Sequence, residues 1–389
     1  MIKVIEMKKI IRISIIILFI FIVSSVMVNA AEDKNETVDN NLYADQSRLT
    51  GADKLYSGLP EETQKLISEM KINILDQEDI SKPELGNIFP AIADLVVNNS
   101  RSPVRMIFTS LGIFLLCSLA EGADVMSGGS TLKKNINAIS SLGVCACCIL
   151  PLCDLVDRCS EVINGASGFI SVYVPVMTGL LVSSSHSITG SSYYSSMMGT
   201  AEVIGLVSSK LIIPMIKIFL TLSAVSTLSP SLRVSGLCSA ISRGIKWILN
   251  FSLGIFVTIM TAQSLISSTM DDVSNRAAKF AVNTFVPIVG GVLSETVNTF
   301  TGSLSLLKSG TGVFVLIASS CIFLPALVEC ILWRFSFSAL GAISDMLGLS
   351  LPASAVKSVE SVCSLITAVL LTTVLIFIIS TVILLIITK

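Results

Sequence analysis

The most apolar part of the sequence is the stretch 361–388, which reads SVCSLITAVLLTTVLIFIISTVILLIIT and is followed by Lys389. It carries no charged residue, and it is longer than the roughly 20 apolar residues that a helix needs to cross the hydrocarbon core of a bilayer. A second stretch, 247–268, is nearly as apolar. Both stretches predict membrane-spanning helices, and they decide the fold class.

The composition of the whole chain agrees with this prediction. Its 389 residues are 52% hydrophobic and 14% charged, and the mean hydropathy is +0.82. Soluble domains carry about 25% charged residues, so this chain has too few charges to cover a soluble particle of its size. An ordinary soluble enzyme is therefore excluded. Nine stretches are candidate spans: 104–121, 136–153, 168–188, 201–229, 247–268, 280–299, 309–333, 336–352 and 361–388.

Charge is distributed unevenly along the chain. Residues 1–30 have a net charge of +3, residues 31–100 of −8 and residues 101–389 of +4. We therefore predict a basic leader, an acidic segment in the water outside the membrane, and a multi-span membrane domain. The expected fold is all-α: a polytopic membrane protein with a small N-terminal helical outer domain.

The leader has the order of features found in secretory signal peptides. Four basic residues precede the apolar run Ile13–Val28, and Asn29-Ala30 then lead into acidic residues. This order predicts a signal peptide that is cleaved after Ala30. The alternative is an uncleaved anchor helix, for which the apolar run is slightly short. In both cases residue 31 starts on the outer side of a membrane.

The acidic segment 31–100 predicts two short amphipathic helices after a disordered stretch, 31–50. The first begins at Pro60-Glu61-Glu62, because proline and acidic residues favour a first helical turn. Apolar residues follow at helical spacing: Leu66, Ile67, Met70 and Ile74. A second start at Ser81-Lys82-Pro83-Glu84 has the spacing of a capping box. Two such helices bury little core alone, so we expect them to pack on each other, on the membrane surface or on a partner.

Basic residues give a weak indication of topology. If all nine stretches span, six basic residues lie in inner segments and eight in outer ones, which contradicts the positive-inside rule. The weakest candidates are 201–229, which carries Lys210 and Lys217, and 336–352, which carries Asp345. Removing one span near 201–229 changes the balance to nine against seven. The charges thus favour an even number of spans.

Two parts of the membrane domain resemble each other. The stretch Tyr173-Val174-Pro175-Val176-Met177-Thr178-Gly179 is similar to Phe285-Val286-Pro287-Ile288-Val289-Gly290-Gly291, at an offset of 112 residues. The similarity predicts an internal repeat with halves of about 136–229 and 247–340. An odd number of spans in each half would make the repeat inverted, and an even number would make the copies parallel.

The repeated Pro-x-x-x-Gly pattern predicts two broken helices, at Pro175 and Gly179 and at Pro287 and Gly291. Proline removes a backbone hydrogen bond and glycine loosens packing. At membrane depth such breaks are tolerated where protein or a water-filled cavity satisfies the backbone. Paired broken helices are one way to build a transport path. The alternative is a pair of kinked helices that pack closely through small residues.

Ionisable residues inside the apolar stretches are further candidates. When the two halves are aligned on Pro214 and Pro325, Lys217 and Glu329 fall one position apart in equivalent helices. We expect these two residues to be neighbours, because buried ionisable groups in membranes usually pair or line water. The alternative is that the lysine reaches the membrane interface with its long side chain.

The sequence lacks the patterns of common enzymes. The single histidine, His186, lies among serines without a nucleophile-elbow motif, so we interpret it as an ordinary helix or loop residue. There is no Walker A sequence, and no basic soluble patch that would bind nucleic acid. Five cysteines lie between Cys145 and Cys159 without zinc-site spacing, which favours small buried hydrophobes over a disulfide or a metal site. We predict no enzyme, no metal and no cofactor.

One block of the sequence resembles a known family. It contains Arg243-Gly244-Ile245-Lys246-Trp247 and the run 271–280, DDVSNRAAKF, and continues through Phe285–Gly291 to Gly302-Ser303 and Leu306-Leu307-Lys308. This block, which covers about 240–335, is similar to stage III sporulation protein AE of endospore-forming bacteria. The leader, the short outer segment and the multi-span remainder fit the same family. The cysteine cluster is not a feature of the family, so it receives no role.

The resemblance implies a place in the mother-cell membrane around the engulfed forespore, the outer forespore membrane. It implies partners as well: a secretion-type ATPase and ring-forming stage III sporulation proteins, with copies of the chain itself as a further option. This apparatus is thought to act as a channel that supports late forespore development. The family has no established catalytic residues.

We predict a transport-path or export-gate subunit, and the alternative is a non-conducting scaffold that anchors the ATPase and the rings. Asp272, Arg276 and Lys279 are expected in a loop that leads into a helix, where Asp272 and Arg276 are spaced to pair. The candidate residues are Pro175, Gly179, Pro287, Gly291, Asp272, Arg276, Lys279, Lys217 and Glu329.

Overall fold

The computed structural model describes residues 51–52, 54–70, 85–127, 130–184, 186–228, 235–285 and 290–387. Every regular element among them is a helix, so the chain has the predicted all-α fold of a polytopic membrane protein. The predicted leader and the stretch 31–50 lie outside the described residues. The elements are α3 (Lys54–Ser57), α4 (Glu61–Glu69), α6 (Leu85–Ser127), α7 (Ser130–Ser183), α8 (Ser187–Leu206), η1 (Val207–Ile212), α9 (Ile213–Leu228), α10 (Ser235–Phe285), α11 (Gly290–Met346) and α12 (Ser350–Ile387).

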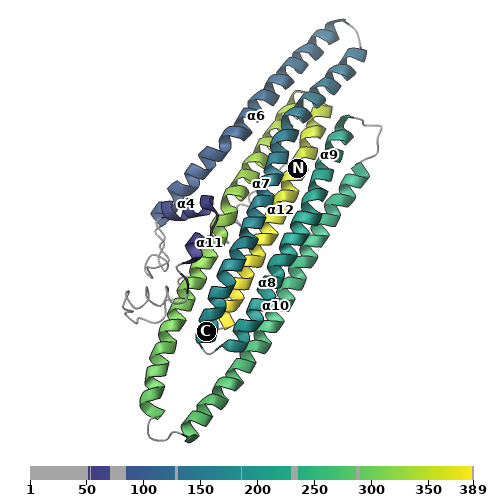
Figure 1. Ribbon diagram of the computed structural model, residues 1–389. Coiled ribbons are helices and arrows are strands. Elements are labelled where there is room, and N and C mark those ends of the chain that lie inside the picture. The colour runs from purple at the N-terminus through teal and green to yellow at the C-terminus, as the bar shows by residue number, and fades with distance from the viewer. Residues whose placement is uncertain are drawn as a thin grey trace.

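The long helices lie side by side and alternate in direction (Figure 1). One end of the bundle holds the turn between α7 and α8, and we call it the α7–α8 end. The opposite end holds the turn between α11 and α12, and we call it the α11–α12 end. Helices α7, α10 and α12 run toward the α7–α8 end, whereas α8–α9 and α11 run away from it. Helix α6 lies at one edge, beside α7 and α11.

Helices α11 and α12 form the centre of the bundle. Of the most apolar window of each, 61% is buried, compared with 22% for α6 and α10. Trp333 stacks on Phe337 within α11, and Phe323 meets Phe377 of α12 edge to face with ring centroids 5.7 Å apart. The other long helices surround this pair, which makes α11 and α12 the structural core.

Among the described residues, six helices are long and apolar enough to cross a membrane: Pro90–Ala120, Ile139–Ser183, Ser187–Ser226, Gly236–Ser274, Gly310–Met346 and Leu351–Ile383. This number is even, as the basic residues favour, but it is smaller than the nine predicted stretches. Helix continuity accounts for two of the three missing spans, and the third, 280–299, includes residues 286–289, which lie outside the described residues. The stretch 136–153 and most of 168–188 belong to α7, and 309–333 and most of 336–352 belong to α11.

The weakest predicted span, 201–229, is helical throughout its described part. A π-helical turn, η1, joins α8 to α9 and ends two residues before Pro214. Proline lacks an N–H and its ring crowds the carbonyl four residues earlier. The wider π turn makes room for the ring there, and such insertions are a recognised cause of local distortion in long helices. Lys210 lies within η1 and Lys217 lies in the first turns of α9.

Residues 51–70 pack against the long helices of the same chain. We call this segment the strap. Helix α4 begins after Pro60, as predicted, and Leu66, Ile67 and Met70 are buried. The strap packs on α7 and α11, and α4 also contacts α6. The predicted second short helix is part of α6, which continues without a break across residue 100. The predicted start at 81–84 lies outside the described residues.

The two predicted halves are two hairpins of long helices. The first contains α7 and α8–α9, the second contains α10 and α11, and the two run in the same direction (Figure 1). Each half therefore has an even number of long helical segments, and the two halves have the same orientation, as expected for parallel copies. The residues matched by sequence are not equivalent in position, because 173–179 lies within α7 whereas Phe285 and Gly290 lie at helix ends.

Candidate functional site

Ionic pairs join three helices of the bundle. Arg158 of α7 donates to the carboxylate of Glu329 on α11, and this carboxylate also accepts a hydrogen bond from Nε1 of Trp333 at 3.4 Å. The adjacent residue on α7, Asp157, pairs with Lys217 of α9, with Nζ 2.6 Å from Oδ1. Two neighbouring residues of α7 thus connect α9 to α11.

A third pair extends this connection to α12. Arg334 of α11 lies five residues after Glu329, and its Nε is 3.8 Å from Oε1 of Glu360 on α12. Both side chains are mostly buried. Three basic and three acidic residues therefore form one neutral set, which we call the charge layer. Its members are Asp157, Arg158, Lys217, Glu329, Arg334 and Glu360.

The predicted pair of Lys217 and Glu329 is not formed directly. Each residue belongs to the charge layer, but each pairs with a different residue of α7. The prediction was wrong about the partner because it paired the two sequence halves with each other, whereas α7 lies between α9 and α11. No spacing rule connects Arg158 to Glu329, since 171 residues separate them.

The predicted helix break at Pro175 is also wrong. Helix α7 is continuous from Ser130 to Ser183 and includes both Pro151 and Pro175. Pro175 and Gly179 are exposed on its outer side. A proline in a membrane helix can be accommodated when neighbouring groups and local adjustment satisfy the freed carbonyl. Pro287 lies outside the described residues, and Gly291 is the second residue of α11.

Helices α8 and α10 meet along a polar seam. Asp271 of α10 is buried, and its carboxylate accepts hydrogen bonds from the backbone N–H groups of Ile188 and Thr189 at 2.9 and 2.8 Å. These groups are among the first four of α8, which have no partner within the helix. The carboxylate therefore caps α8 from another helix, where a negative charge is favoured by the helix dipole.

The seam continues along both helices. Ser267 donates to Ser192 at 2.9 Å, and Ser196 donates to Oε1 of Gln263. On α10 these residues and Asp271 are spaced four apart, so they share one face. Sequence analysis missed this seam, although Asp271 was part of the block that carries the family resemblance. The four-residue spacing of Gln263, Ser267 and Asp271 is the signal that would have found it.

The predicted loop residues near this seam lie in a helix. Asp272, Arg276 and Lys279 all fall within α10, which ends only at Phe285. Asp272 and Arg276 are exposed on its outer face, and the side chain of Lys279 lies outside the described residues. The charged run 271–279 is helical because its alanines and charged residues are compatible with a helix and no proline interrupts it.

The cysteines and the histidine have structural positions. All ten cysteines are free thiols, and Sγ of Cys159 lies 3.9 Å from Sγ of Cys330, next to the Arg158–Glu329 pair. The described residues contain no group of three histidine, cysteine, aspartate or glutamate side chains placed to hold a metal ion. His186 precedes the first residue of α8, and its Nδ1 lies 2.8 Å from the carbonyl oxygen of Ser184, which confirms its role as an ordinary residue at a helix end.

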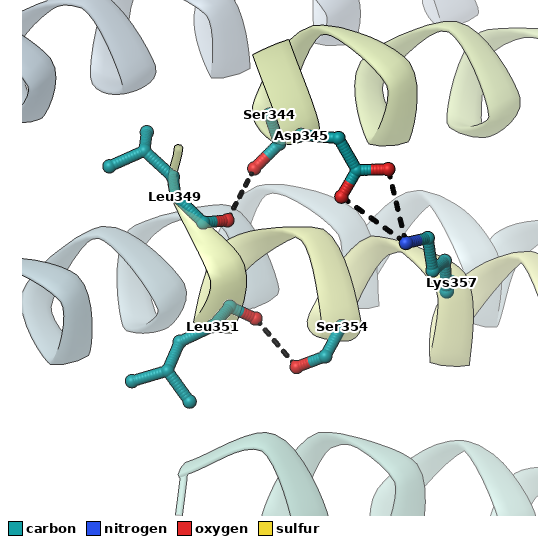
Figure 2. Close-up of polar contacts among 6 residues, drawn as sticks. All are labelled: Ser344, Asp345, Leu349, Leu351, Ser354 and Lys357. Atoms are coloured by element: carbon teal, nitrogen blue, oxygen red, sulfur yellow. Dashed lines mark hydrogen bonds and ion pairs between the residues drawn. The ribbon is translucent and has the colours of Figure 1, made fainter. Parts of the chain in front are cut away.

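A separate ionic pair lies at the α11–α12 end. Figure 2 shows Lys357 of α12 donating to both carboxylate oxygens of Asp345 on α11, each at 3.2 Å. Ser344 donates to the carbonyl oxygen of Leu349 at 2.9 Å in the same turn (Figure 2). Gly348 has a φ of +73°, a left-handed conformation that glycine adopts without strain and that ends α11. The Asp345–Lys357 pair is exposed, in contrast to Glu329, Arg334 and Glu360 of the charge layer.

Comparison with known proteins agrees with the sequence block described above. A family model described as stage III sporulation protein AE matches residues 69–388. The chain belongs to this family. Stage III sporulation protein AE of Bacillus subtilis (strain 168) is 23% identical over 193 residues, which cover 50% of this chain and 48% of that protein. The match thus spans about half the length of each. No solved structure matches the chain.

Membership in the family establishes a role in sporulation, and the six apolar helices establish a multi-pass membrane protein. The matched residues include all of α6 to α12, and with them the charge layer and the polar seam. Both features therefore belong to the part of the chain that carries the family likeness.

Proposed function

We propose that this chain is a membrane subunit of the apparatus that connects mother cell and forespore, and that it forms part of a transport path or export gate. It acts in the mother-cell membrane around the forespore, together with a secretion-type ATPase and ring-forming subunits. The role is not enzymatic. Late forespore development depends on the path.

The charge layer is the observation that carries this proposal. Glu329, Arg334 and Glu360 are mostly buried within helices whose remaining surfaces are apolar. Ionisable residues within membrane helices are costly, and they commonly mark ion, proton or substrate pathways. A set with equal numbers of both charges can exchange its pairs without leaving a net charge on the set, which is a property that a gate requires.

A non-conducting scaffold is the second candidate, and the packing of the core favours it. At Gly312 an added Cβ would lie 2.5 Å from Cδ2 of Leu385, so α11 and α12 approach each other closely. Helix α7 is also uninterrupted at Pro175. A closely packed, continuous bundle is suited to anchoring partners.

One experiment distinguishes the two functions. Arg334→Gln and Glu360→Gln are combined in the full chain, and the counts of heat-resistant spores and the co-purification of partner subunits are measured together. A transport path predicts that spore counts fall at least tenfold while the partners still co-purify. A scaffold predicts that spore counts fall only when co-purification is lost. Asp345→Asn combined with Lys357→Gln is the matched control, because it removes an exposed pair between the same two helices.

A further inference from the structure

The strap is held firmly on α7 and α11. An added Cβ at Gly58 would lie 2.8 Å from Cγ1 of Val172, and one at Gly165 would lie 3.2 Å from Cγ of Pro60. Leu55, Leu59 and Thr63 are buried in this contact. Within the strap, Gln64 donates to the carbonyl oxygen of Leu59 at 2.8 Å. The strap is therefore an integral layer of the bundle on this side.

The outer surface of the strap is charged. Five of its charged side chains are exposed: Lys54, Glu61, Glu62, Lys65 and Glu69. Arg158 on α7 is half exposed as well. One side of the bundle, which we call the strap face, is thus polar.

The strap lies beside the apolar span of α7 rather than beyond its end. Its contacts with α7 are at Gly165 and Val172, inside the apolar span Ile139–Ser183. Contacts between helices show which residues share this level. The hydroxyl of Tyr173 lies 3.4 Å from that of Tyr193 on α8, and Ser192 contacts Ser267 on α10. Figure 1 shows the strap helix α4 on the α11 side of the bundle and α10 on the other side.

At the same level, the outer surface of α10 is apolar. Phe251, Ile255, Ile259 and Ile266 lie along the outside of α10, and all are exposed, with exposed fractions of 44–60%. Apolar side chains on the outside of a membrane helix are suited to lipid. One cross-section of the bundle therefore has an apolar surface on α10 and a charged surface on the strap.

These two surfaces are suited to different surroundings. Charged side chains at membrane depth face protein or a water-filled cavity, not acyl chains. We propose that α10 borders lipid while the strap face borders an enclosed aqueous space, so that each chain forms one wall of that space. This inference rests on the proposed transport path, for which it names the side of the bundle that borders the path.

Accessibility to a water-soluble thiol reagent tests the inference. Lys65→Cys and Glu69→Cys report on the strap face, and Ile255→Cys and Ile259→Cys report on α10, each in the full-length chain. Membranes are opened by freezing and thawing so that a charged maleimide reaches both sides. Labelling is measured at the introduced cysteine by peptide mass spectrometry, relative to denatured protein, so the native cysteines can remain.

We expect the strap positions to react at least tenfold faster than the α10 positions. Two results would overturn the inference. Slow labelling at both places would mean that the strap face is covered by lipid or protein. Fast labelling at both places would mean that this part of the bundle lies outside the bilayer.

The two native tryptophans provide a second measurement. Trp247 on α10 is exposed, whereas Trp333 on α11 is fully buried. In vesicles of phosphatidylcholine brominated near the headgroup, fluorescence of the Trp333→Phe variant should be strongly quenched, and that of the Trp247→Phe variant should not. Absence of quenching at Trp247 would contradict a lipid-facing α10.

Failure of this inference and failure of the proposed function are distinguishable. The labelling rates could differ as expected while the variants of Arg334 and Glu360 leave spore counts unchanged. That result would support the aqueous space at the strap face and contradict a role of the charge layer in transport. If spore counts fall with the partners still bound but both faces are protected, the path lies elsewhere in the bundle.

Discussion

Arg158 and Glu329 form an ion pair whose two side chains differ in exposure: 50% for the arginine and 7% for the glutamate. The arginine can reach water when the pair opens, whereas the glutamate is left in the bundle beside Trp333. Removal of one member therefore has a different consequence from removal of the other. This asymmetry also makes the pair suited to a change of partners. When the pair opens, only the charge of Glu329 remains inside the bundle, because Arg158 can be hydrated.

The first prediction concerns this asymmetry. Arg158→Ala should destabilise the protein by about 2–4 kcal/mol, because it leaves a buried carboxylate without its partner. Glu329→Gln should cost less, about 1–2 kcal/mol, since the amide keeps the shape and an acceptor for Trp333 while the half-exposed arginine turns to water. Thermal unfolding in detergent, followed by tryptophan fluorescence, measures both.

Lys357→Ala is the control for the first prediction, because its partner Asp345 is exposed and gains hydration. Its unfolding temperature should remain within a degree or two of the wild type. A larger loss in Glu329→Gln than in Arg158→Ala would show that the glutamate does more than accept from the arginine.

The second prediction concerns partner identity within the charge layer. Lys217→Asp and Asp157→Lys should each reduce spore counts, because each reversal places two like charges side by side between α7 and α9. The double variant pairs opposite charges again and should restore the counts in part. The matched double variant Lys217→Glu with Glu329→Lys should restore nothing. Counts of heat-resistant spores measure all four variants. Recovery by the second double variant instead of the first would show that the pairing differs in the assembled protein.

The charge layer illustrates how far sequence alone leads. Hydropathy predicted that Lys217 and Glu329 lie within apolar helices, and each of them forms an ion pair there. It did not identify the partners, because a pair of side chains on helices 171 positions apart leaves no local pattern. An apparent repeat then suggested a wrong neighbour. Pairing between helices depends on which helix lies between which others, and that is a property of the packed bundle.

The third prediction concerns the cap at the polar seam. Asp271→Ala should cost about 1–2 kcal/mol, because two backbone N–H groups at the start of α8 lose their acceptor. Asp272→Ala is the matched control. It removes the same charge one residue later on the exposed side of α10 and should change stability little. Hydrogen exchange at Ile188 and Thr189 should rise in the first variant only, and equal effects in both would contradict the cap.

The seam also shows why element boundaries escaped prediction. The charged run 271–279 suggested a loop because it separates two apolar stretches, yet α10 continues to Phe285. Likewise, Pro175 suggested a broken helix, yet α7 continues. Charges and prolines interrupt hydropathy without necessarily interrupting a helix, because packing on neighbouring helices compensates for weak local preference. The fold class followed from composition, whereas the lengths of the helices depended on contacts made far along the chain.

The fourth prediction concerns the attachment of the strap. Gly58→Ala places a methyl group against Val172, whose branched side chain has little freedom to move in a helix. We expect a loss of about 1–3 kcal/mol, as for other overpacked contacts, and faster hydrogen exchange across residues 54–70. The contact between α11 and α12 should remain intact, because it does not involve the strap.

Two further variants make the fourth prediction specific. Gly168→Ala adds the same methyl group to α7 where no atom lies within 4 Å, so it should leave exchange in the strap unchanged. Val172→Ala removes the two methyl groups nearest to the new side chain, so the double variant Gly58→Ala with Val172→Ala should regain part of the lost protection. Two results would show that residues 51–70 do not pack on α7 in the membrane. One is faster hydrogen exchange in the strap of the Gly168→Ala variant, and the other is unchanged exchange in the strap of the Gly58→Ala variant. The polar surface assigned to that face would then have no support.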